Sequence, residues 1–496
     1  MVSPLSQNLP TGTDATSAAQ RESPPPLVID LDRTLLRIDT LHEQLVDLLF
    51  TKPARFFLAL LRLPRGRAAF KRYVTEASEP FAIHDAFVNA DLMGFVTKQK
   101  EQGREVHLIT AADQSIASAV ASELPFFDSA IGSDGVNLKS KVKRDRILGL
   151  FPSGYAYAGD GPHDLPIWSS AQRVLLVGVD EKTRRQVAEL GKPIEFETQR
   201  SGTWWHWVRL FRVHQWSKNI LVAIPLLLSH QFGSLTSIAH ALLAFVAISL
   251  MASAGYIVND VADRNSDRAH PTKKLRPVAS GQIDPIHALI AAAILASVAL
   301  IVATLISWST SLLLLVYALG TLGYTIFIKK LVLADVFALA GLYTARIVIG
   351  AAAINVELSH WLFAFSLLLF FSLSLAKRHG ELVKATMSGG DLGRLLGRGY
   401  RPDDATLLLA LGVSSTMCAV LLLSLYVATD AYRYTGYSGP GYLWGAVVSV
   451  FAWSTRVWLK SHRGELDSDP VVFALRDPVS RMIIVVSGLF FFLSVI

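Results

Sequence analysis

The feature that most constrains this 496-residue chain is a series of long apolar runs that fills its second half. A helix needs about 20 apolar residues to cross a hydrocarbon core of about 30 Å. Nine segments beyond residue 218 meet or approach this requirement: 219–235, 238–258, 285–307, 311–328, 331–353, 359–376, 405–427, 440–459 and 478–496. Nine such runs separated by short charged loops would be unusual for core helices of a soluble protein, so the pattern predicts an all-α bundle of nine transmembrane helices.

Charge alternates between the loops that separate these runs. The loops before the first run and after the second, fourth, sixth and eighth are basic, whereas the others hold almost no lysine or arginine, Arg433 being the exception. Basic loops stay on the cytoplasmic side of a membrane. The pattern predicts a multi-pass protein of the cytoplasmic (inner) membrane, with a cytoplasmic N-terminal part and an outer C-terminus. Because a lipid bilayer accounts for the basic loops, the net charge of +7 needs no nucleic-acid partner. A homo-oligomer stays open.

The first 200 residues carry charges throughout and are typical of a soluble domain. Residues 1–26 are rich in Ser, Thr, Pro and Ala and contain no apolar core segment, which predicts a disordered tail without a signal peptide. We expect a folded domain over 27–195, an amphipathic linker over 196–215 and a membrane domain over 216–496. The single cysteine, Cys418, lies in an apolar run and excludes a disulfide framework or a cysteine metal site.

A cluster of polar residues follows the second predicted span. Asn259, Asp263 and Asp267 are four residues apart, with Asp260 beside the first, so a continuing helix would place them on one face. Carboxylates stacked in this way repel one another, but their oxygens are the ligands that Mg²⁺ prefers, and Mg²⁺ often bridges to substrate phosphates. The following bases can neutralise phosphate oxygens beside the metal; they are Lys273, Lys274 and Arg276. The alternative is a solvated loop in which acids and bases pair.

These four residues match the pattern NDxxDxxxD, in which the segment resembles the UbiA prenyltransferase superfamily. The resemblance implies nine helices around a cytoplasm-facing cavity. It also implies Mg²⁺ as the cofactor that holds a diphosphate leaving group, and a polyprenyl chain as one substrate.

Further motifs resemble the branch that contains decaprenyl-phosphate phosphoribosyltransferases. They are QWSKN at 215–219, HPTKKLRP at 270–277, Lys377-Arg378 followed by Glu381, and DPVVFALRDPVSR at 469–481. This resemblance runs from about residue 205 to the end. It implies that a lipid phosphate attacks phosphoribosyl diphosphate.

One departure from the aromatic prenyltransferases bears on the substrate. Those enzymes carry a second aspartate pair, DxxxD, after a Tyr-x-x-x-Lys element. This chain has Tyr324 followed by Lys329, but then only Asp335, with Arg346 eleven residues later. Charges inside a membrane are costly unless paired or functional. We therefore favour an anionic acceptor bound by Arg346 and nearby lysines; alternatively, Asp335 and Arg346 form a buried ion pair.

The favoured reaction is a displacement at the anomeric carbon of phosphoribosyl diphosphate, with Mg²⁺ on Asp260, Asp263 and Asp267 stabilising the departing pyrophosphate. Bases at the cytoplasmic span ends are candidates to hold phosphates, although each could instead set topology; they are Lys218, Lys329, Lys377 and Arg378. Two alternatives are a transferase that moves a polyprenyl group from its diphosphate to an aromatic acceptor, and a membrane transporter.

The N-terminal domain carries a second set of motifs. Asp30 and Asp32 follow a short apolar strand, a pair in which one carboxylate can attack phosphorus while the other acts as acid and base. A second strand ends at Thr110, lysines stand at 139, 141 and 143, and Asp160 and Asp164 flank a Gly-Pro-His turn.

In this order the motifs look like those of haloacid-dehalogenase-type (HAD) phosphatases, over residues 27–195. The resemblance implies an α/β Rossmann-like domain, with residues from about 40 to 100 as a helical cap. It implies Asp30 as nucleophile, Asp32 as acid/base, and Thr110 and Lys143 on the phosphate. It further implies Mg²⁺ held by Asp30, Asp32, Asp160 and Asp164. Arg33 stands where that family usually has Gly. We favour a working phosphatase that removes the 5-phosphate of the phosphoribosyl product.

Overall fold

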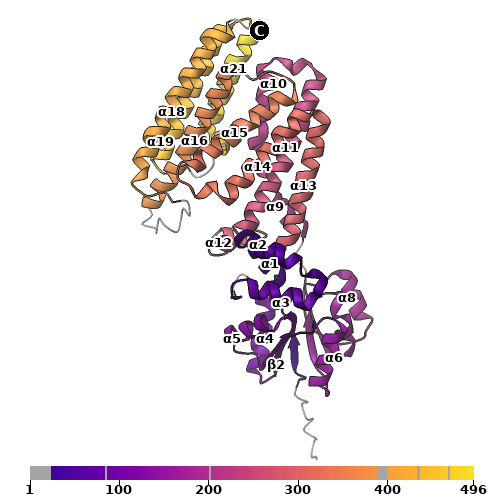
Figure 1. Cartoon of the computed structure of the whole chain (residues 1–496). Helices are drawn as coiled ribbons and strands as arrows, with labels where there is room; N and C mark the ends of the chain where they lie inside the picture. Colours follow the sequence, from indigo (N-terminus) through magenta and orange to yellow (C-terminus); the bar gives the residue numbers. More distant parts are fainter. Residues whose placement is uncertain (1–23, 84–86, 200–202, 388–398, 433–435, 467–469) are drawn as a thin grey trace, which may run out of the picture. The chain divides into compact units, whose positions relative to one another are not determined.

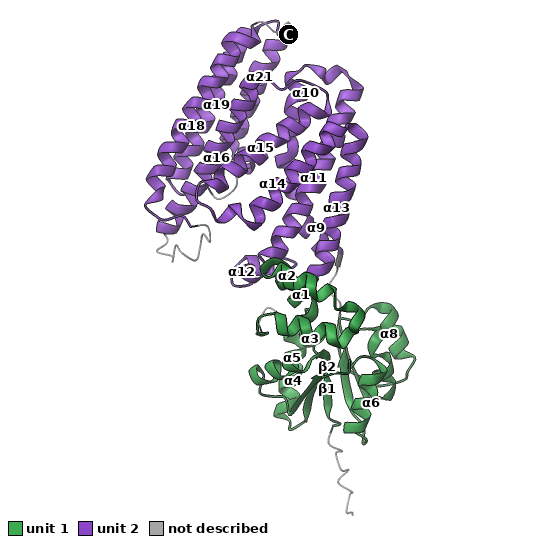
Figure 2. Cartoon of the chain, viewed as in Figure 1, with its two compact units in different colours: residues 1–201 green, residues 202–496 purple. Residues whose placement is uncertain are grey.

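The computed structural model describes residues 24–83, 87–199, 203–387, 399–432, 436–466 and 470–496 (Figure 1). The chain divides into two compact units, Met1–Ser201 and Gly202–Ile496 (Figure 2). Most of the predicted tail, and Arg433, lie outside the described residues.

Unit 1 is built on a six-stranded parallel sheet with the order β3-β2-β1-β4-β5-β6. The strands are β1 (Leu27–Ile29), β2 (Val106–Asp113), β3 (Ser129–Ser133), β4 (Ala156–Gly159), β5 (Arg173–Val177) and β6 (Ile194–Thr198). Val28 is in register with His107 on one side and Tyr157 on the other. This is a doubly wound order, in which the direction of strand progression reverses between β1 and β4. β6 extends the sheet three residues past the predicted domain end at 195.

Helices cover both faces of this sheet, which explains why its central strands are continuous apolar runs. They are α4 (Ala90–Glu101), α5 (Gln114–Glu123), α6 (Lys141–Leu150), α7 (Leu165–Ser170) and α8 (Glu181–Ala188). Alternate residues of β1 point to opposite faces. Leu27 and Ile29 belong to the core that includes Val96 of α4, whereas Val28 belongs to the core that includes Ile147 of α6.

Between β1 and α4 lies a helical segment, shorter than the predicted cap, that we call the cap. It comprises α1 (Thr40–Thr51), α2 (Pro53–Leu60), the 3₁₀ turn η1 (Leu63–Arg65) and α3 (Arg67–Ala77). The predicted cap reached residue 100, but α4 belongs to the sheet layer because Leu92 and Val96 are fully buried in the core beside β1.

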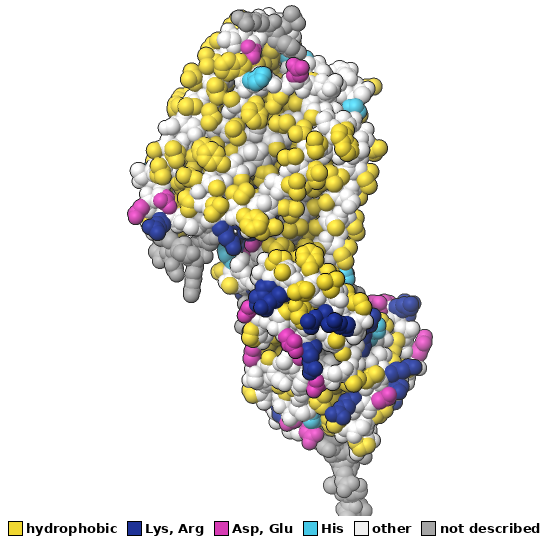
Figure 3. Space-filling view, in the orientation of Figure 1, with side chains coloured by type: hydrophobic (Ala, Val, Ile, Leu, Met, Phe, Trp, Pro, Cys, Tyr) yellow, Lys and Arg dark blue, Asp and Glu magenta, His cyan; other side chains and the backbone are white. Residues whose placement is uncertain are grey.

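Unit 2 is all-helical. Its helices are α9 (Thr203–Phe211), α10 (Ile224–Leu228), α11 (Leu235–Ala262), α12 (Arg264–Arg268), α13 (Pro285–Ile306), α14 (Trp308–Ile326), α15 (Ala334–Ala353), α16 (His360–Met387), α18 (Asp404–Tyr426), α19 (Leu443–His462), α20 (Pro470–Arg476) and α21 (Pro478–Val495). Two 3₁₀ segments connect these helices: η4 (Val213–Ala223) lies between α9 and α10, and η7 (Ile328–Lys330) lies between α14 and α15. In the view of Figure 3, hydrophobic side chains cover the middle of this unit and charged ones gather near its ends.

Seven described helices are long and apolar enough to cross a membrane, namely α11, α13, α14, α15, α16, α18 with its π-helical continuation to Ala431, and α21. The other two predicted spans differ from expectation. Residues 219–235 form no continuous helix, because 3₁₀ geometry runs to Ala223, α10 ends at Leu228 and His230 takes a left-handed conformation with φ 58°. The span predicted at 440–459 corresponds to the 20-residue α19, which carries Arg456 and Lys460 and is not among the seven.

Candidate active sites

The aspartates predicted to bind Mg²⁺ lie where α11 ends and α12 begins. The predicted single helix is interrupted at Asp263, which stands between Ala262 and Arg264. The helical spacing nevertheless survives, because Asp263 N donates to the carbonyl of Asn259 and Asp267 N to that of Asp263, each at 2.9 Å. Asp260 and Asp267 are buried, and Asp263 is partly exposed.

Each of these carboxylates faces a base from another segment. Arg276 Nη1 lies 2.7 Å from Asp267 Oδ2 and 3.2 Å from Asp260 Oδ1, and Arg212 also binds Asp260. Lys329 Nζ, on η7, lies 2.5 Å from Asp263 Oδ1.

Lys329 Nζ also donates to Asn259 Oδ1 at 3.3 Å. The acids and bases therefore pair, as expected for the alternative in which this segment is a solvated loop. They form a largely buried cluster, however, rather than a solvated loop. We call this set the acid–base cluster: Asn259, Asp260, Asp263, Asp267, Arg212, Arg276 and Lys329. Arg212 was not predicted, because its contact spans 48 residues of sequence.

The remaining predicted bases differ in exposure. Lys273 and Lys274 are exposed on a 3₁₀ turn, Lys273–Leu275. Lys218 on η4 and Lys377 on α16 are partly buried. They stay candidates for phosphate binding.

A second buried polar group links α15 and α16. Arg378 Nε lies 2.8 Å from Asp335 Oδ2, and the Tyr400 hydroxyl donates to Asp335 Oδ1 at 2.5 Å. Arg378 also pairs with Glu381 at 2.7 Å and lies near Tyr324 of α14. The alternative pair of Asp335 with Arg346 is wrong, because Asp335 is held by Arg378.

Arg346 instead joins three elements. Its Nε donates to Asn219 Oδ1 of η4 at 2.9 Å, and its Nη2 donates to the Tyr317 hydroxyl of α14 at 2.8 Å. Nη1 donates to the Leu342 carbonyl on its own helix at 2.6 Å. These three acceptors are uncharged groups.

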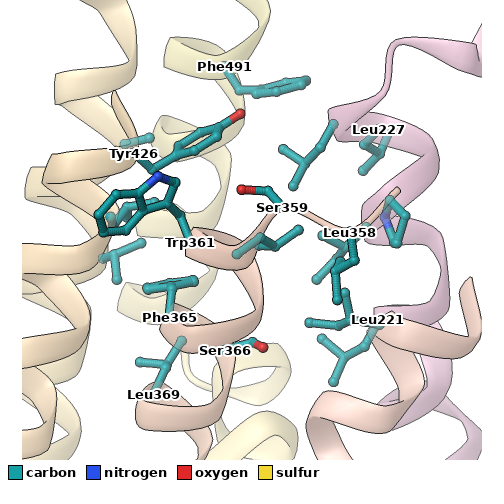
Figure 4. Close-up of a pocket in the computed structure, with 18 of the residues that line it drawn as sticks. Leu221, Leu227, Leu358, Ser359, Trp361, Phe365, Ser366, Leu369, Tyr426 and Phe491 are labelled. Atoms are coloured by element: carbon teal, nitrogen blue, oxygen red, sulfur yellow. The ribbon is translucent and has the colours of Figure 1, made fainter. Parts of the chain in front are cut away.

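A cavity of about 900 Å³ in unit 2 is lined mostly by apolar side chains (Figure 4). One part of its wall contains Leu221, two residues after Asn219, and Ile347, the residue after Arg346. Another part contains Tyr426 and Phe491. Sequence patterns could not find this cavity, because apolar residues that line a cavity and those that face lipid look alike.

In unit 1, the predicted aspartates meet at the carboxyl edge of the sheet, at the point where the strand order reverses. Asp30 follows β1 and Asp160 follows β4. Oxygens of Asp30, Asp160 and Asp164 lie within 4.8 Å of one another, and among the described residues this is the carboxylate set spaced to hold a metal ion. Asp164 is fixed in place, because its Oδ1 accepts from the Tyr157 hydroxyl at 2.8 Å and its Oδ2 from Asp160 N at 3.1 Å.

Asp32 is not in that set, and its role as a metal ligand stays a prediction. Its Oδ1 accepts a hydrogen bond from Thr40 N at 2.9 Å, at the start of the cap. Lys143 Nζ lies 2.8 Å from Asp30 Oδ1, and its role on the phosphate stays a prediction. Thr110 is fully buried on β2, and its Oγ1 accepts from Ala112 N at 3.0 Å.

The electrostatics of this site favour a bound cation. Burial, with the neighbouring Asp164 and Asp30, raises the pKa of Asp160 to about 8. Burial and Asp30 likewise raise the pKa of Asp164 to about 6. Burial and Asp39 raise the pKa of Asp32 to about 7. Buried carboxylates this close repel one another, and a divalent cation with oxygen ligands relieves the repulsion. The donor set therefore fits Mg²⁺.

Cap and sheet enclose a pocket of about 370 Å³ above these carboxylates. Arg33, Arg67 and Lys71 line it together with Asp30 and Lys143. Lys71, which was not predicted, donates to the Ala111 carbonyl at 2.7 Å, and burial lowers its pKa. The abundance of cations suits an anionic substrate.

Comparison with known proteins gives a family match and several relatives. The model of the UbiA prenyltransferase family matches residues 220–475. Protein y4nM of Sinorhizobium fredii is 37% identical over 462 residues, 92% of this chain and 89% of that one, so the similarity includes most of both units. Nodulation protein NoeC of Azorhizobium caulinodans is 30% identical over 276 residues, 55% of this chain and 88% of its own length.

Decaprenyl-phosphate phosphoribosyltransferase of Mycobacterium tuberculosis is 30% identical over 284 residues, which are 56% of this chain and 89% of that protein. Among solved structures, a UbiA homologue of Archaeoglobus fulgidus bound to GPP and Mg²⁺ is 16% identical. That match covers 58% of this chain and 98% of the other, with a TM-score of 0.40.

Proposed function

The chain belongs to the UbiA prenyltransferase family, and from this premise we propose that unit 2 transfers phosphoribosyl from phosphoribosyl diphosphate to a polyprenyl phosphate. The observation that carries the proposal is the acid–base cluster, in which three aspartates at one point of the bundle face Arg212, Arg276 and Lys329. Family membership favours a transferase over the transporter alternative.

The cluster suits a diphosphate because its ion pairs can exchange partners. Without substrate, the bases neutralise the carboxylates. A diphosphate offers Arg276 and Lys329 negatively charged oxygens that can replace the carboxylates as their partners. The carboxylates are then available to bind Mg²⁺. Bound there, Mg²⁺ stabilises the negative charge that develops on the leaving pyrophosphate.

The chemistry then needs little from the protein beyond positioning. An oxygen of the lipid phosphate attacks the anomeric carbon, the bond from that carbon to the pyrophosphate oxygen breaks, and pyrophosphate leaves with the electron pair. The attacker is already an anion, so no general base is required. Arg276 and Lys329 hold the donor, and holding both reactants in line supplies much of the rate.

The large cavity supports a lipid substrate. Its apolar lining suits a polyprenyl chain, while the guanidinium of Arg346, held by Asn219 and Tyr317, lies beside lining residue Ile347. A cation at this point suits the phosphate of a lipid acceptor. The 30% identity to a protein named decaprenyl-phosphate phosphoribosyltransferase supports the same choice.

The test is a competition between donors. Purified protein in nanodiscs receives labelled phosphoribosyl diphosphate with polyprenyl phosphate, or a labelled prenyl diphosphate with an aromatic acid. The proposal predicts labelled lipid and equimolar pyrophosphate from the first pair only. Product from the second pair alone would establish the prenyltransferase alternative.

We further propose that unit 1 is an HAD-type phosphatase that removes the 5-phosphate from the product. Support comes from Asp30 beside Lys143 and from the carboxylates of Asp160 and Asp164. Asp30 Oδ attacks phosphorus and the bond to the sugar oxygen breaks, while Asp32 donates its proton to that oxygen. Asp32 then takes a proton from the water that hydrolyses the aspartyl phosphate. Mg²⁺ at the carboxylates neutralises charge on the phosphoryl oxygens.

Phosphate release from the purified lipid product measures this activity. We expect wild type to release inorganic phosphate and Asp30→Asn to release none, with Asp91→Asn on the far helix α4 as a matched control that keeps wild-type release. Equal release by wild type and Asp30→Asn would contradict the proposal.

A further inference from the structure

The cap of unit 1 exposes an apolar surface that its own fold does not use. Ten large hydrophobic side chains are exposed among the described residues of this unit, and five of them lie within seven consecutive positions. We call them the cap face: Phe57, Leu58, Leu60, Leu61 and Leu63. Leu61 is 74% exposed and Phe57 60%. A soluble domain rarely gathers such residues in water without a partner.

The segment is held in this orientation by contacts on its other side. Within α2 only Ala59 is buried. Arg55 Nη1 donates to the Ala77 carbonyl of α3 at 3.3 Å, and the Arg62 guanidinium lies 4.0 Å from the ring centre of Tyr73. Lys52, just before α2, pairs with Glu79 at 2.6 Å. These contacts fix α2 on α3 with the cap face directed away from the domain.

The charge around the cap face has one sign. Residues 52–72 contain seven lysines and arginines and no aspartate or glutamate. A short apolar helix edged by cations is the pattern of segments that lie in the interface of an anionic bilayer, with the apolar side among the acyl chains and the cations at the head groups. A protein partner would not require this excess of positive charge.

We propose that the cap face is a membrane-docking surface that inserts into the head-group region of an anionic bilayer. The covalent link of unit 1 to a membrane unit makes a bilayer the surface constantly available to it. Leu63 and the nearby Arg67 also line the pocket above Asp30. Docking therefore brings that pocket to the depth of lipid phosphates. This consequence rests on the proposed phosphatase function, whereas docking itself does not.

Collisional quenching tests docking without any substrate. The full chain, with Cys418→Ser to remove the native thiol, carries one fluorophore on Leu61→Cys and is reconstituted in bilayers with anionic phospholipid. The control carries the fluorophore on Val142→Cys of α6, which is exposed in the same unit but outside the cap. Lipids with a nitroxide high on the acyl chain and iodide in the buffer serve as the two quenchers.

We expect the lipid nitroxide to quench the Leu61→Cys label at least about twofold more than the Val142→Cys label, with the opposite order for iodide. Replacing the anionic lipid with phosphatidylcholine lowers the lipid quenching. Equal quenching at the two positions overturns the proposal. Shielding of Leu61→Cys from both quenchers also overturns it, because a protein surface then covers the cap face. Since no substrate is present, failure here leaves the phosphatase proposal untouched.

Discussion

Arg33 adopts a left-handed backbone conformation, with φ 60°, directly after Asp32. A side chain with a β-carbon pays about 1 kcal/mol for this conformation and glycine does not. Arg33 stands where HAD phosphatases usually have Gly, so the backbone here carries a strain that glycine would not have. The turn is held closed by Arg33 N donating to the Ile38 carbonyl at 3.0 Å.

Two variants separate the strain from the charge at this position. Arg33→Ala removes the charge and keeps the strain, whereas Arg33→Gly removes both. We predict that Arg33→Gly is more stable than Arg33→Ala by about 1 kcal/mol in free energy of unfolding, measured by denaturant titration of unit 1 signals in the full chain. The reverse order would show that the turn is not left-handed.

The raised pKa values in unit 1 predict an unusual dependence of stability on pH. The folded state holds protons on Asp160 up to about pH 8 and on Asp164 up to about pH 6, whereas the unfolded chain loses them near 3.8. Between these values the native state binds more protons, so without metal its stability falls as pH rises. Mg²⁺ binds the deprotonated carboxylates and should therefore stabilise unit 1 far more at pH 8 than at pH 5.

Thermal unfolding with EDTA or Mg²⁺ at several pH values measures this effect. Asp160→Asn is the matched variant, because it removes the carboxylate with the largest shift and should flatten the pH profile. The contrary result is a wild-type stability in EDTA that increases from pH 5 to pH 8, together with no such increase in Asp160→Asn. It would show that the pKa of Asp160 is not raised in the folded state.

At the scale of elements, the close approach of η4 to α15 positions the Arg346 contacts. A β-carbon on Gly350 would lie 2.1 Å from the Val222 carbonyl oxygen, whereas one on Gly341 of the same helix would meet nothing within 4 Å. Gly350→Ala must push η4 away and disturb the bond from Arg346 to Asn219. We predict a loss of about 1–3 kcal/mol and reduced transfer for Gly350→Ala, and neither for Gly341→Ala. Thermal unfolding and lipid product formation measure both, and equal behaviour of the two variants would contradict the packing described.

The elements show what sequence patterns could and could not predict. Apolar runs located the strands around Asp30 and Asp160, and helical spacing brought Asp260, Asp263 and Asp267 to one site. The first predicted span failed because hydropathy does not register Pro225 or the left-handed turn at His230. Partners such as Arg212 and Lys71 escaped prediction because tertiary contacts, rather than local spacing, bring them to their sites.

At the scale of the whole molecule, our proposals place two chemically different sites in one chain. The similarity to y4nM includes most of both units, so both units have counterparts in another protein. The two candidate sites have separate carboxylates, and the pocket above Asp30 lies within unit 1. We predict that Asp30→Asn abolishes phosphate release while phosphoribosyl transfer stays at the wild-type rate, so that the phosphorylated lipid accumulates. Chromatography of labelled lipid products measures this accumulation. Loss of both activities in this variant, with the fold intact, would contradict independent sites.

The central claim is that the acid–base cluster holds a magnesium-bound diphosphate, and the most direct measurement is the magnesium dependence of lipid product formation by Asp263→Ala. Asp403→Ala is the control, because Asp403 is an exposed aspartate of the same unit whose side chain makes no cap hydrogen bond at the start of α18. We predict that Asp263→Ala loses at least about a hundredfold in rate at saturating Mg²⁺, while Asp403→Ala matches wild type. Wild-type turnover and unchanged magnesium dependence in Asp263→Ala would contradict it.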